Sequence, residues 1–322
     1  MTGGDRSPAA AAGPTRPGHD YPEPPTSGEL ALELPAGVRW AVGLSHDVDH
    51  LGLREHLVDR FLLATAFNAL RQNFRRRFRP WRALDQLAGL GLAALGHDRW
   101  DTIDELREFE QRTGVTSTWF FAVRPGLGIR YRPEQAASRI VRLAEAGFEI
   151  GLHGQSPDDG GRLAEEFATL RGISPSPVDG LRMHYLRLAR GVLDGMERSG
   201  ARYDSTVMDR RHTDPRTHPL PGPRRMRAGL VELPLHVMDS TLFSVTGFGL
   251  SGDEALDWVL RLARTAAARG RALVINLHPN YFSRQTPDIR RWYVRLLGEL
   301  TSRSDVLVTT LGDLVSRLRD PR

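Results

Sequence analysis

The stretch Trp40-Ala41-Val42-Gly43-Leu44-Ser45-His46-Asp47-Val48-Asp49-His50 decides the fold. Its first half, residues 40–44, is apolar and of the type found in buried strands, and its second half holds two histidines and two aspartates. An apolar run that passes directly into polar residues is typical of a parallel strand whose carboxyl end carries a functional site. We therefore expect a strand over 40–44 and a site immediately after it.

The same alternation of strand-like and helical segments continues to the end of the chain. Further strands are expected at 118–123, 148–152, 272–277 and 305–309, with weaker candidates near 180–183, 202–204 and 231–235. Amphipathic helical patterns lie at 102–112, 134–146, 253–268 and 288–300. Repeated β-α alternation predicts an α/β fold with a mostly parallel sheet covered by helices. About seven or eight strands favour a closed or nearly closed barrel.

One domain accounts for most of the chain. Residues 1–36 are rich in glycine, proline and alanine and are expected to be a disordered lead-in. Residues 37–320 form the expected barrel, which is interrupted at 51–100 by a helical insertion after the first strand. Because loops in such folds are short, an insertion of this length is expected to line or cover a site.

The composition excludes several kinds of chemistry. The 322 residues include no cysteine, which rules out disulfides, thiolate metal sites and a cysteine nucleophile. All 44 basic residues are arginines, so no lysine can form a Schiff base or serve a phosphate-binding loop. Catalysis must therefore use histidine, carboxylate, arginine and hydroxyl side chains, together with any metal that imidazoles and carboxylates can hold.

The net charge of +5 is modest for this length, and its strongest concentration is the run Arg75-Arg76-Arg77-Phe78-Arg79-Pro80-Trp81-Arg82. This run is expected to be a solvated helix end or loop, with contact to a membrane or another anionic surface as the alternative. No nucleic-acid-binding module is recognisable, so a nucleic-acid partner is not expected. No sustained apolar segment marks a signal peptide or a membrane span, and the expected location is cytoplasmic.

Histidines gather where the expected strands end. Of the 11 histidines, five follow a strand candidate directly or within two residues: His46, His153, His184, His236 and His278. Each alone could be a structural histidine, and Asp47 and Asp49 could cap the following segment. His236 and Asp239, after another strand, either line a substrate cleft or serve the structure. Together, on one face of a barrel, these residues indicate a metal site or an acid–base site.

Five short motifs follow one another in a recognisable order. They are His46-Asp47-Val48-Asp49, Glu149-Ile150-Gly151-Leu152-His153-Gly154, Arg182-Met183-His184-Tyr185-Leu186, Tyr203-Asp204-Ser205-Thr206 and Leu277-His278-Pro279. Over residues 38–318 this series resembles the polysaccharide deacetylase superfamily, the NodB-homology group of carbohydrate esterases, and most of all its bacterial surface-polysaccharide branch. The resemblance implies a distorted (β/α) barrel with seven strands. It also implies a divalent metal, usually zinc, that serves hydrolysis of N-acetyl or O-acetyl groups on a sugar.

The resemblance assigns catalytic roles to four residues. Asp47 would be the general base, and Arg182 would hold its carboxylate in orientation. His278 would be the general acid that protonates the leaving group, and Asp204 would tune that histidine.

The resemblance also implies metal ligands, with two departures from the usual pattern. Asp49 and His153 would bind the metal, although Val48 separates Asp49 from the other aspartate of the first motif. An extended segment still places both aspartates on one side. The second motif normally has a second histidine four residues after the first, but Pro157 stands there. The candidates for the third ligand, in order of preference, are His184, His46 and Asp158.

Three kinds of function fit these residues. The leading interpretation is a metal-dependent hydrolase that removes acetyl groups from a carbohydrate. The same barrel and metal could instead hydrolyse another C–N bond, such as that of a cyclic amide. Because the second motif lacks its second histidine, the third is a non-catalytic member that binds a glycan or an assembly partner. A third ligand found beside Asp49 and His153 would favour an enzyme.

Overall fold

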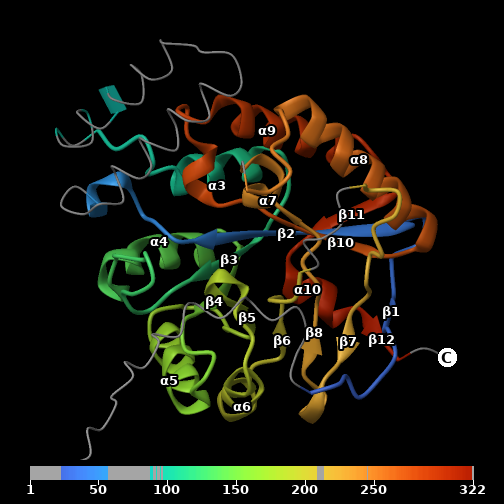
Figure 1. Ribbon diagram of the computed structural model, residues 1–322, viewed down its shortest axis with the longest axis horizontal. Coiled ribbons are helices and arrows are strands. Elements are labelled where there is room, and N and C mark those ends of the chain that lie inside the picture. Colours follow the sequence, from blue (N-terminus) through green and yellow to red (C-terminus); the bar gives the residue numbers. More distant parts are fainter. Residues whose placement is uncertain are drawn as a thin grey trace, which may run out of the picture.

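Strand β2 (Trp40–Val48) lies at the centre of the sheet (Figure 1). Strand β10 (Ala272–Asn276) runs parallel along one side of it. On its other side β11 (Val306–Thr309) pairs with the first half of β2, and β3 (Thr118–Phe121) pairs with the second half. All nine residues of β2 are buried. The strand therefore continues four residues past the predicted 40–44, into the polar stretch.

The computed structural model describes residues 23–56, 97–208, 214–244 and 246–320, together with residues 88, 89, 92 and 95. Most of the expected helical insertion at 51–100 lies outside the described residues. The arginine-rich run at 75–82 lies outside them entirely.

The described parallel strands curl into a distorted barrel that closes on itself. From β2 and β3 the order continues through β4 (Glu149–Gly154), β5 (Gly180–Met183) and β6 (Tyr203–Asp204). One continuous segment completes the ring: its start, β8 (Val231–Glu232), pairs with β6, and its end, β9 (Val237–Met238), pairs with β10. If β8 and β9 are counted as one strand position and β11, which pairs with the start of β2, is left out, the described part of the barrel has seven parallel strand positions. The predicted (β/α) barrel is confirmed.

Helices flank the strands, and the connections from β2 through β6 and from β9 to β11 pass through them (Figure 1). The described part of the connection from β6 to β8 has a short strand and a 3-10 turn instead. In chain order they are α3 (Ile103–Arg112), α4 (Pro133–Glu145), α5 (Gly160–Arg171), α6 (Arg190–Ser199), α7 (Asp239–Phe243), α8 (Gly252–Arg269), α9 (Pro287–Thr301) and α10 (Leu311–Ser316). The four helices predicted from the sequence are α3, α4, α8 and α9, and their bounds agree within one residue at each end. Short 3-10 turns are η1 (Leu53–His56), η2 (His184–Leu186), η3 (Arg227–Gly229) and η4 (Pro279–Phe282).

The pleat of β2 separates two apolar layers, because successive side chains of a strand point to opposite faces. The outward-facing residues pack with the covering helices: Trp40, Val42 and Leu44. Ala41 faces the interior of the barrel and belongs to the inner of the two apolar layers. Leucine side chains of α10 fill the space beside Gly43 in the same layer. Ser45 and Asp47 continue this inward-facing row. The amino end of the barrel is thus filled by apolar side chains, and its carboxyl end is polar.

Two glycines make room for aromatic rings inside the barrel. A Cβ atom on Gly151 would lie 2.6 Å from the ring of Phe120, and one on Gly180 would overlap the ring of Tyr203. These positions require glycine because a ring occupies the space of the missing side chain. The guanidinium of Arg182 lies 4.6 Å from the centroid of the Phe120 ring. The rings therefore form the floor beneath the polar end of the barrel.

The expected disordered lead-in at 1–36 is too long. Residues 31–32 form β1 (Ala31–Leu32), which pairs antiparallel with β12 (Leu318–Arg319) near the end of the chain. Glu29 forms a bridge with β7 (Arg224–Arg225), which pairs antiparallel with β8. A two-residue strand leaves no apolar run in the sequence. The high glycine and proline content therefore suggested disorder, and nothing in the sequence indicated that residues 31–32 pair with β12.

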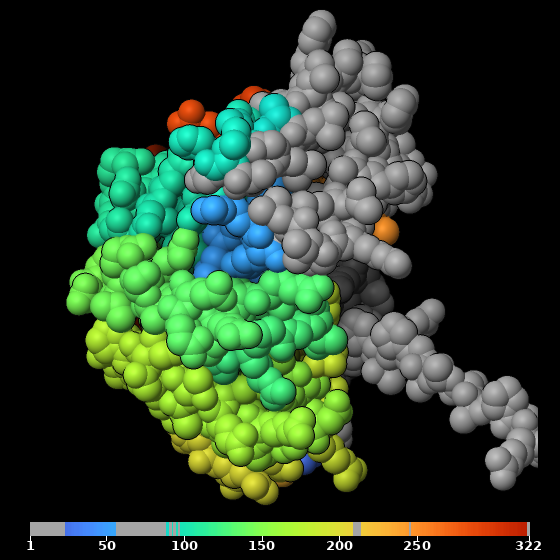
Figure 2. Space-filling view, turned by 90° about the vertical axis from the view of Figure 1, so that its left-hand side faces the viewer, coloured from blue at the N-terminus to red at the C-terminus, as the bar shows by residue number. Residues whose placement is uncertain are grey.

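The outer surface agrees with this arrangement. Figure 2 looks onto the side that α3 to α6 cover, in teal to yellow-green, and the light-blue residues after β2 reach the surface between them. Among the described residues, no helix is both long enough and apolar enough to cross a bilayer.

Candidate metal and acid–base site

The carboxyl ends of several strands meet around a cleft of about 220 Å³. His153 comes from β4, His184 directly follows β5, and His278 lies just beyond β10. Asp47 and Asp49 come from the end of β2. These five residues line the cleft with His50, Tyr185, Leu186, Met238, Ser240, Asn280 and Tyr281. The structure thus brings together residues that are more than 200 positions apart in the sequence.

Asp49, His153 and His184 form a compact triad in this cleft. Oδ1 of Asp49 lies 3.2 Å from Nε2 of His153 and 3.3 Å from Nδ1 of His184, and the two nitrogens are 3.0 Å apart. A tetrahedral zinc ion with ligand bonds of about 2.0–2.1 Å requires ligand atoms roughly 3.3 Å apart. The three atoms therefore have the spacing that one divalent cation needs. The first of the three candidates for the third ligand, His184, is the one that the structure places in the triad.

The contacts with surrounding residues leave the inner atoms of the triad directed at one another. Nε2 of His184 bonds to the carbonyl of Leu127 at 3.0 Å, so in the neutral ring Nδ1 presents a lone pair to Asp49. Oδ1 of Asp49 is buried and forms no hydrogen bond with any described residue. Burial would raise the pKa of Asp49, but the surrounding imidazoles, His153 first among them, hold it well below its usual value. An ionised carboxylate and an imidazole lone pair that point to one place fit a metal ion.

Asp47 lies next to the triad and is paired with Arg182. NH1 of Arg182 is 3.0 Å from Oδ1 of Asp47, and both side chains are buried. Burial would raise the pKa of Asp47, but the Arg182 guanidinium and the imidazoles of the cleft lower it below its usual value. Asp47 is therefore an ionised carboxylate held in one orientation, as a general base requires.

The guanidinium of Arg182 is itself fixed on every side. Besides the aspartate, NH1 donates to Oγ of Ser45 at 2.8 Å and to Oδ1 of Asn276 at 2.7 Å. Nε and NH2 donate to the carbonyl and the hydroxyl of Ser205, each at 2.9 Å. The ring of Phe120 packs against its face. Its position below the cleft is thus set by four strands of the barrel.

Asp239, the first residue of α7, binds His278 twice. Oδ1 of Asp239 is 2.7 Å from Nδ1 of His278, and Oδ2 accepts the backbone N–H of the same histidine at 2.6 Å. Burial would lower the pKa of His278, but the Asp239 carboxylate, helped by the other aspartates of the cleft, raises it to about 10. Nε2 lies 3.7 Å from Oδ2 of Asp49. The ring is therefore cationic near neutral pH and presents Nε2 as a proton donor to the cleft.

The predicted pairing of Asp204 with His278 is wrong. Asp204 pairs in register with Leu181, which packs in the outer apolar layer, so its side chain leaves the barrel on the outer face. Its carboxylate accepts the hydroxyl of Thr206 at 2.5 Å. Asp239 binds His278 instead because β9 lies next to β10, whereas β6 lies between β5 and β8.

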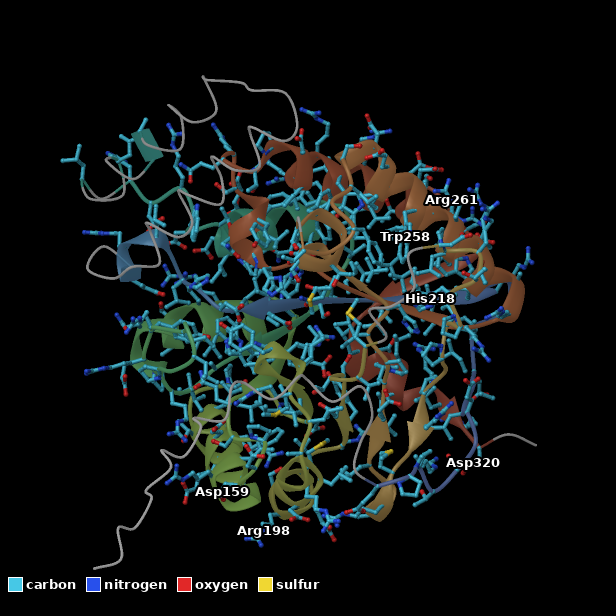
Figure 3. All side chains as sticks on the ribbon, viewed as in Figure 1. Asp159, Arg198, His218, Trp258, Arg261 and Asp320 are labelled. Atoms are coloured by element: carbon cyan, nitrogen blue, oxygen red, sulfur yellow. The ribbon has the colours of Figure 1, made fainter. Side chains whose placement is uncertain are left out.

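The two other candidates for the third ligand lie away from the triad. Nδ1 of His46 is 2.7 Å from the carbonyl oxygen of Leu277, and Nε2 is 2.9 Å from the carboxylate of Glu110, so both nitrogens are used on the outer face of β2. Asp158 is exposed in the turn before α5. Figure 3 labels the next residue, Asp159, at the edge of the molecule.

His236 serves the structure. Nδ1 accepts the N–H of Val274 and Nε2 bonds to the carbonyl of Pro221, both at 3.0 Å. Burial lowers the pKa of His236 to about 3, so the ring is neutral. Its neighbour His218 packs against Trp258 on the α8 side of the barrel, where Figure 3 labels both. This pair lies outside the cleft.

Several residues that line the cleft had no role assigned from the sequence, and three of them lie close to a motif histidine. Asn280 and Tyr281 follow His278 on η4 and line the cleft beside it. Tyr185 follows His184, and its ring lies over the imidazole with 4.0 Å between the centroids. Tyr185 already stands in the third motif, and extending the last motif by two positions would have found Asn280 and Tyr281.

Comparison with known proteins identifies the fold. No protein-family model matches the chain, and no curated protein sequence matches it. A solved structure from Mycobacterium smegmatis, assigned to the polysaccharide deacetylases, superposes with a TM-score of 0.60, covering 92% of this chain and 95% of its own at 20% identity. One from Pseudomonas aeruginosa PAO1 with the same assignment gives 0.56, with 88% and 92% covered at 15% identity. The chain has the polysaccharide deacetylase fold.

The polysaccharide deacetylase fold confirms the resemblance seen in the motifs, at the level of architecture. An allantoinase shares it, with a TM-score of 0.55 over 88% of this chain and 91% of its own at 16% identity. Solved proteins named for different reactions thus have the same polysaccharide deacetylase fold. The residues of the cleft must therefore decide the function.

Proposed function

We propose that this protein is a metal-dependent hydrolase that removes acetyl groups from a carbohydrate. The observation that carries the proposal is the meeting, in one cleft, of a three-residue ligand set, an ionised carboxylate and a cationic imidazole. Catalytic zinc sites use three protein ligands and leave one position for water or substrate. The triad supplies three ligands and opens to the cleft.

Asp49, His153 and His184 would hold the ion. Zinc suits two imidazoles and one carboxylate, and such sets occur in zinc hydrolases. A bound divalent cation supplies Lewis acidity to the acyl carbonyl and to the attacking water.

The residues around the triad would move the protons. Asp47 accepts the proton of the attacking water, and Arg182 keeps the carboxylate ionised and oriented for it. His278 donates a proton from Nε2 to the leaving atom of the sugar, and Asp239 holds the ring cationic until then. The cleft thus offers two separate residues for proton transfer, Asp47 as the base and His278 as the acid.

A carbohydrate substrate fits the mouth of the cleft. Tyr185 is 58% exposed there, and its ring packs at a tilt against the imidazole of His184. An exposed aromatic face beside polar groups offers the apolar surface on which the C–H face of a sugar ring packs. The surface-polysaccharide setting, the cytoplasmic location and the anionic-surface contact through residues 75–82 stay predictions from the sequence.

Acetate release tests the proposal. The zinc-loaded protein is incubated with N-acetylated and O-acetylated oligosaccharides and, as a competing C–N substrate, allantoin. We expect acetate from an acetylated sugar, loss of that activity on chelation, and none from the Asp47→Asn variant. Release of product only from allantoin would replace this function, and tight glycan binding without any turnover would favour the non-catalytic interpretation.

A further inference from the structure

A buried polar pair lies on the outer face of β2, away from the cleft. Nε2 of His46 is 2.9 Å from Oε1 of Glu110 on α3, and both side chains are fully buried. Glu110 also accepts hydrogen bonds from the hydroxyls of Ser117, at 2.6 Å, and Tyr293. The ring of Trp119 packs against the imidazole, with 4.4 Å between the centroids. These contacts from α3, α9 and β3 hold the imidazole in one position.

The stability of the fold does not account for this pair. Taking polar side chains out of water costs free energy, which their hydrogen bonds to each other largely offset. Apolar side chains of similar volume at such places often give equal or greater stability. The outward-facing neighbours of His46 on β2, Leu44 and Val48, are apolar. A polar pair in this layer therefore calls for a contact that apolar side chains cannot make.

The second ring nitrogen of His46 makes that contact. Nδ1 is 2.7 Å from the carbonyl oxygen of Leu277, the residue that precedes the proposed general acid His278. Because a carbonyl oxygen can only accept, Nδ1 carries a proton and donates it. The N–H of His278 belongs to the same peptide group and donates to Oδ2 of Asp239 at 2.6 Å. This peptide group is thus held at both ends, its C=O by His46 and its N–H by Asp239.

Helix α3 holds the same segment at a second point. The hydroxyl of Thr102, directly before the helix, donates to the carbonyl of Pro279 at 2.5 Å. Glu110 lies near the other end of α3 and reaches the segment through His46. The helix therefore fixes the chain on both sides of His278, although it contributes no residue to the lining of the cleft.

We propose that His46, held by Glu110, is a positioning residue that keeps His278 in place in the cleft by fixing the carbonyl of Leu277. This inference rests on the proposed function and adds to it a contact made from outside the barrel. A displacement of the peptide group would move the backbone of His278 and with it Nε2. An error of about 1 Å in the place of a reacting group can lower a rate by about 10²-fold. Because His46 does not line the cleft, the contact should act on kcat and not on KM.

Two substitutions of His46 separate its two contacts. In His46→Asn the carboxamide nitrogen takes the place of Nδ1, so the bond to Leu277 is kept and the contact with Glu110 is lost. In His46→Gln the nitrogen takes the place of Nε2, so the contact with Glu110 is kept and the bond to Leu277 is lost. Both variants lose the imidazole ring. A purely structural role would make His46→Asn the worse of the two, because it deprives a buried carboxylate of a hydrogen-bond partner.

Steady-state rates and amide hydrogen exchange of the full-length, zinc-loaded protein test the inference. We expect kcat for acetate release to fall by roughly 10–10²-fold in His46→Gln, with KM within about twofold of the wild type. In His46→Asn kcat should stay within about threefold. The backbone N–H of His278 should exchange about five- to tenfold faster in His46→Gln, relative to the N–H of Ile275 in β10, and at the wild-type ratio in His46→Asn.

The inference and the proposed function fail in different ways. Equal losses of kcat in the two variants, a larger loss in His46→Asn, or an unchanged exchange ratio of His278 in His46→Gln would overturn the inference. If no form of the protein releases acetate but His278 exchanges faster in His46→Gln alone, hydrolysis is refuted and the hold of His46 on His278 stands. If the wild type and both variants release acetate at the same rate, the proposed function is supported and the positioning role is refuted.

Discussion

The carboxylate of Asp239 holds His278 by two contacts at once, 2.7 Å to the ring nitrogen Nδ1 and 2.6 Å to the backbone nitrogen. The first contact fixes the ring and its charge, and the second fixes the turn that follows β10. Because β9 and β10 are neighbouring strands, this pair depends on closure of the barrel by the segment that carries both β8 and β9. The position of His278, the proposed general acid, thus depends on the pairing of β9 with β10.

Removing the charge of Asp239 should move the pH profile. In Asp239→Asn the pKa of His278 falls from about 10 toward its ordinary value of 6.5, because the largest charge that raises it is gone. A general acid acts in its protonated form, so activity falls as the pH rises through this pKa. We therefore expect the alkaline limb of kcat/KM to shift to lower pH by about one unit or more. Asp158→Asn, at an exposed site, should leave it in place. A lower rate with an unshifted limb would contradict this role.

Asp47→Asn should separate catalysis from metal binding. Asparagine keeps the shape of the side chain and a contact with Arg182 but cannot accept the proton of water. We expect kcat to fall by roughly 10²–10⁴-fold while elemental analysis shows the metal content of the wild type. If the variant loses its metal as well, Asp47 is a ligand, and the division of labour between the two aspartates is incorrect.

The neutral His236 should make the fold sensitive to acid. Its pKa is about 3 in the folded protein and near 6.5 in the unfolded chain, so between these values the unfolded chain binds a proton that the folded protein does not. Stability from this site is complete above about pH 6.5 and is lost as the pH falls, on the order of a few kcal/mol by pH 4.5. Urea unfolding at both pH values measures it. His236→Gln does not titrate and should lose less stability on acidification; an equal loss would show that other groups cause it.

Most of the fold could be predicted from the sequence because most strands and helices have the hydrophobic pattern typical of their type. Buried parallel strands are largely apolar, so 40–44, 118–123 and 148–152 stood out, and the four predicted helices agree with the structure within one residue at each end. The pairing of β1 with β12 was missed because two residues make no pattern. Tertiary contact, not local preference, keeps that segment in place.

A site residue could be predicted from the sequence when it directly follows a strand. A contact could not be predicted when it depends on which two strands are neighbours in the sheet. The ends of β2, β4 and β5 carry Asp49, His153 and His184, and their meeting follows from a parallel barrel. The partner of His278 could not be read in this way, because nothing in the sequence tells that the segment with Asp239, and not β6, lies beside β10.

Metal content measured by elemental analysis tests the central claim most directly. Zinc-reconstituted wild-type protein should hold about one ion per chain, and His153→Ala and His184→Ala should each lose it, because each removes one of three ligands. Asp158→Ala, which alters the exposed alternative candidate, should retain it. A wild type that binds no metal after reconstitution, or a His184→Ala variant with full metal content, would contradict the assignment of Asp49, His153 and His184 as the metal site.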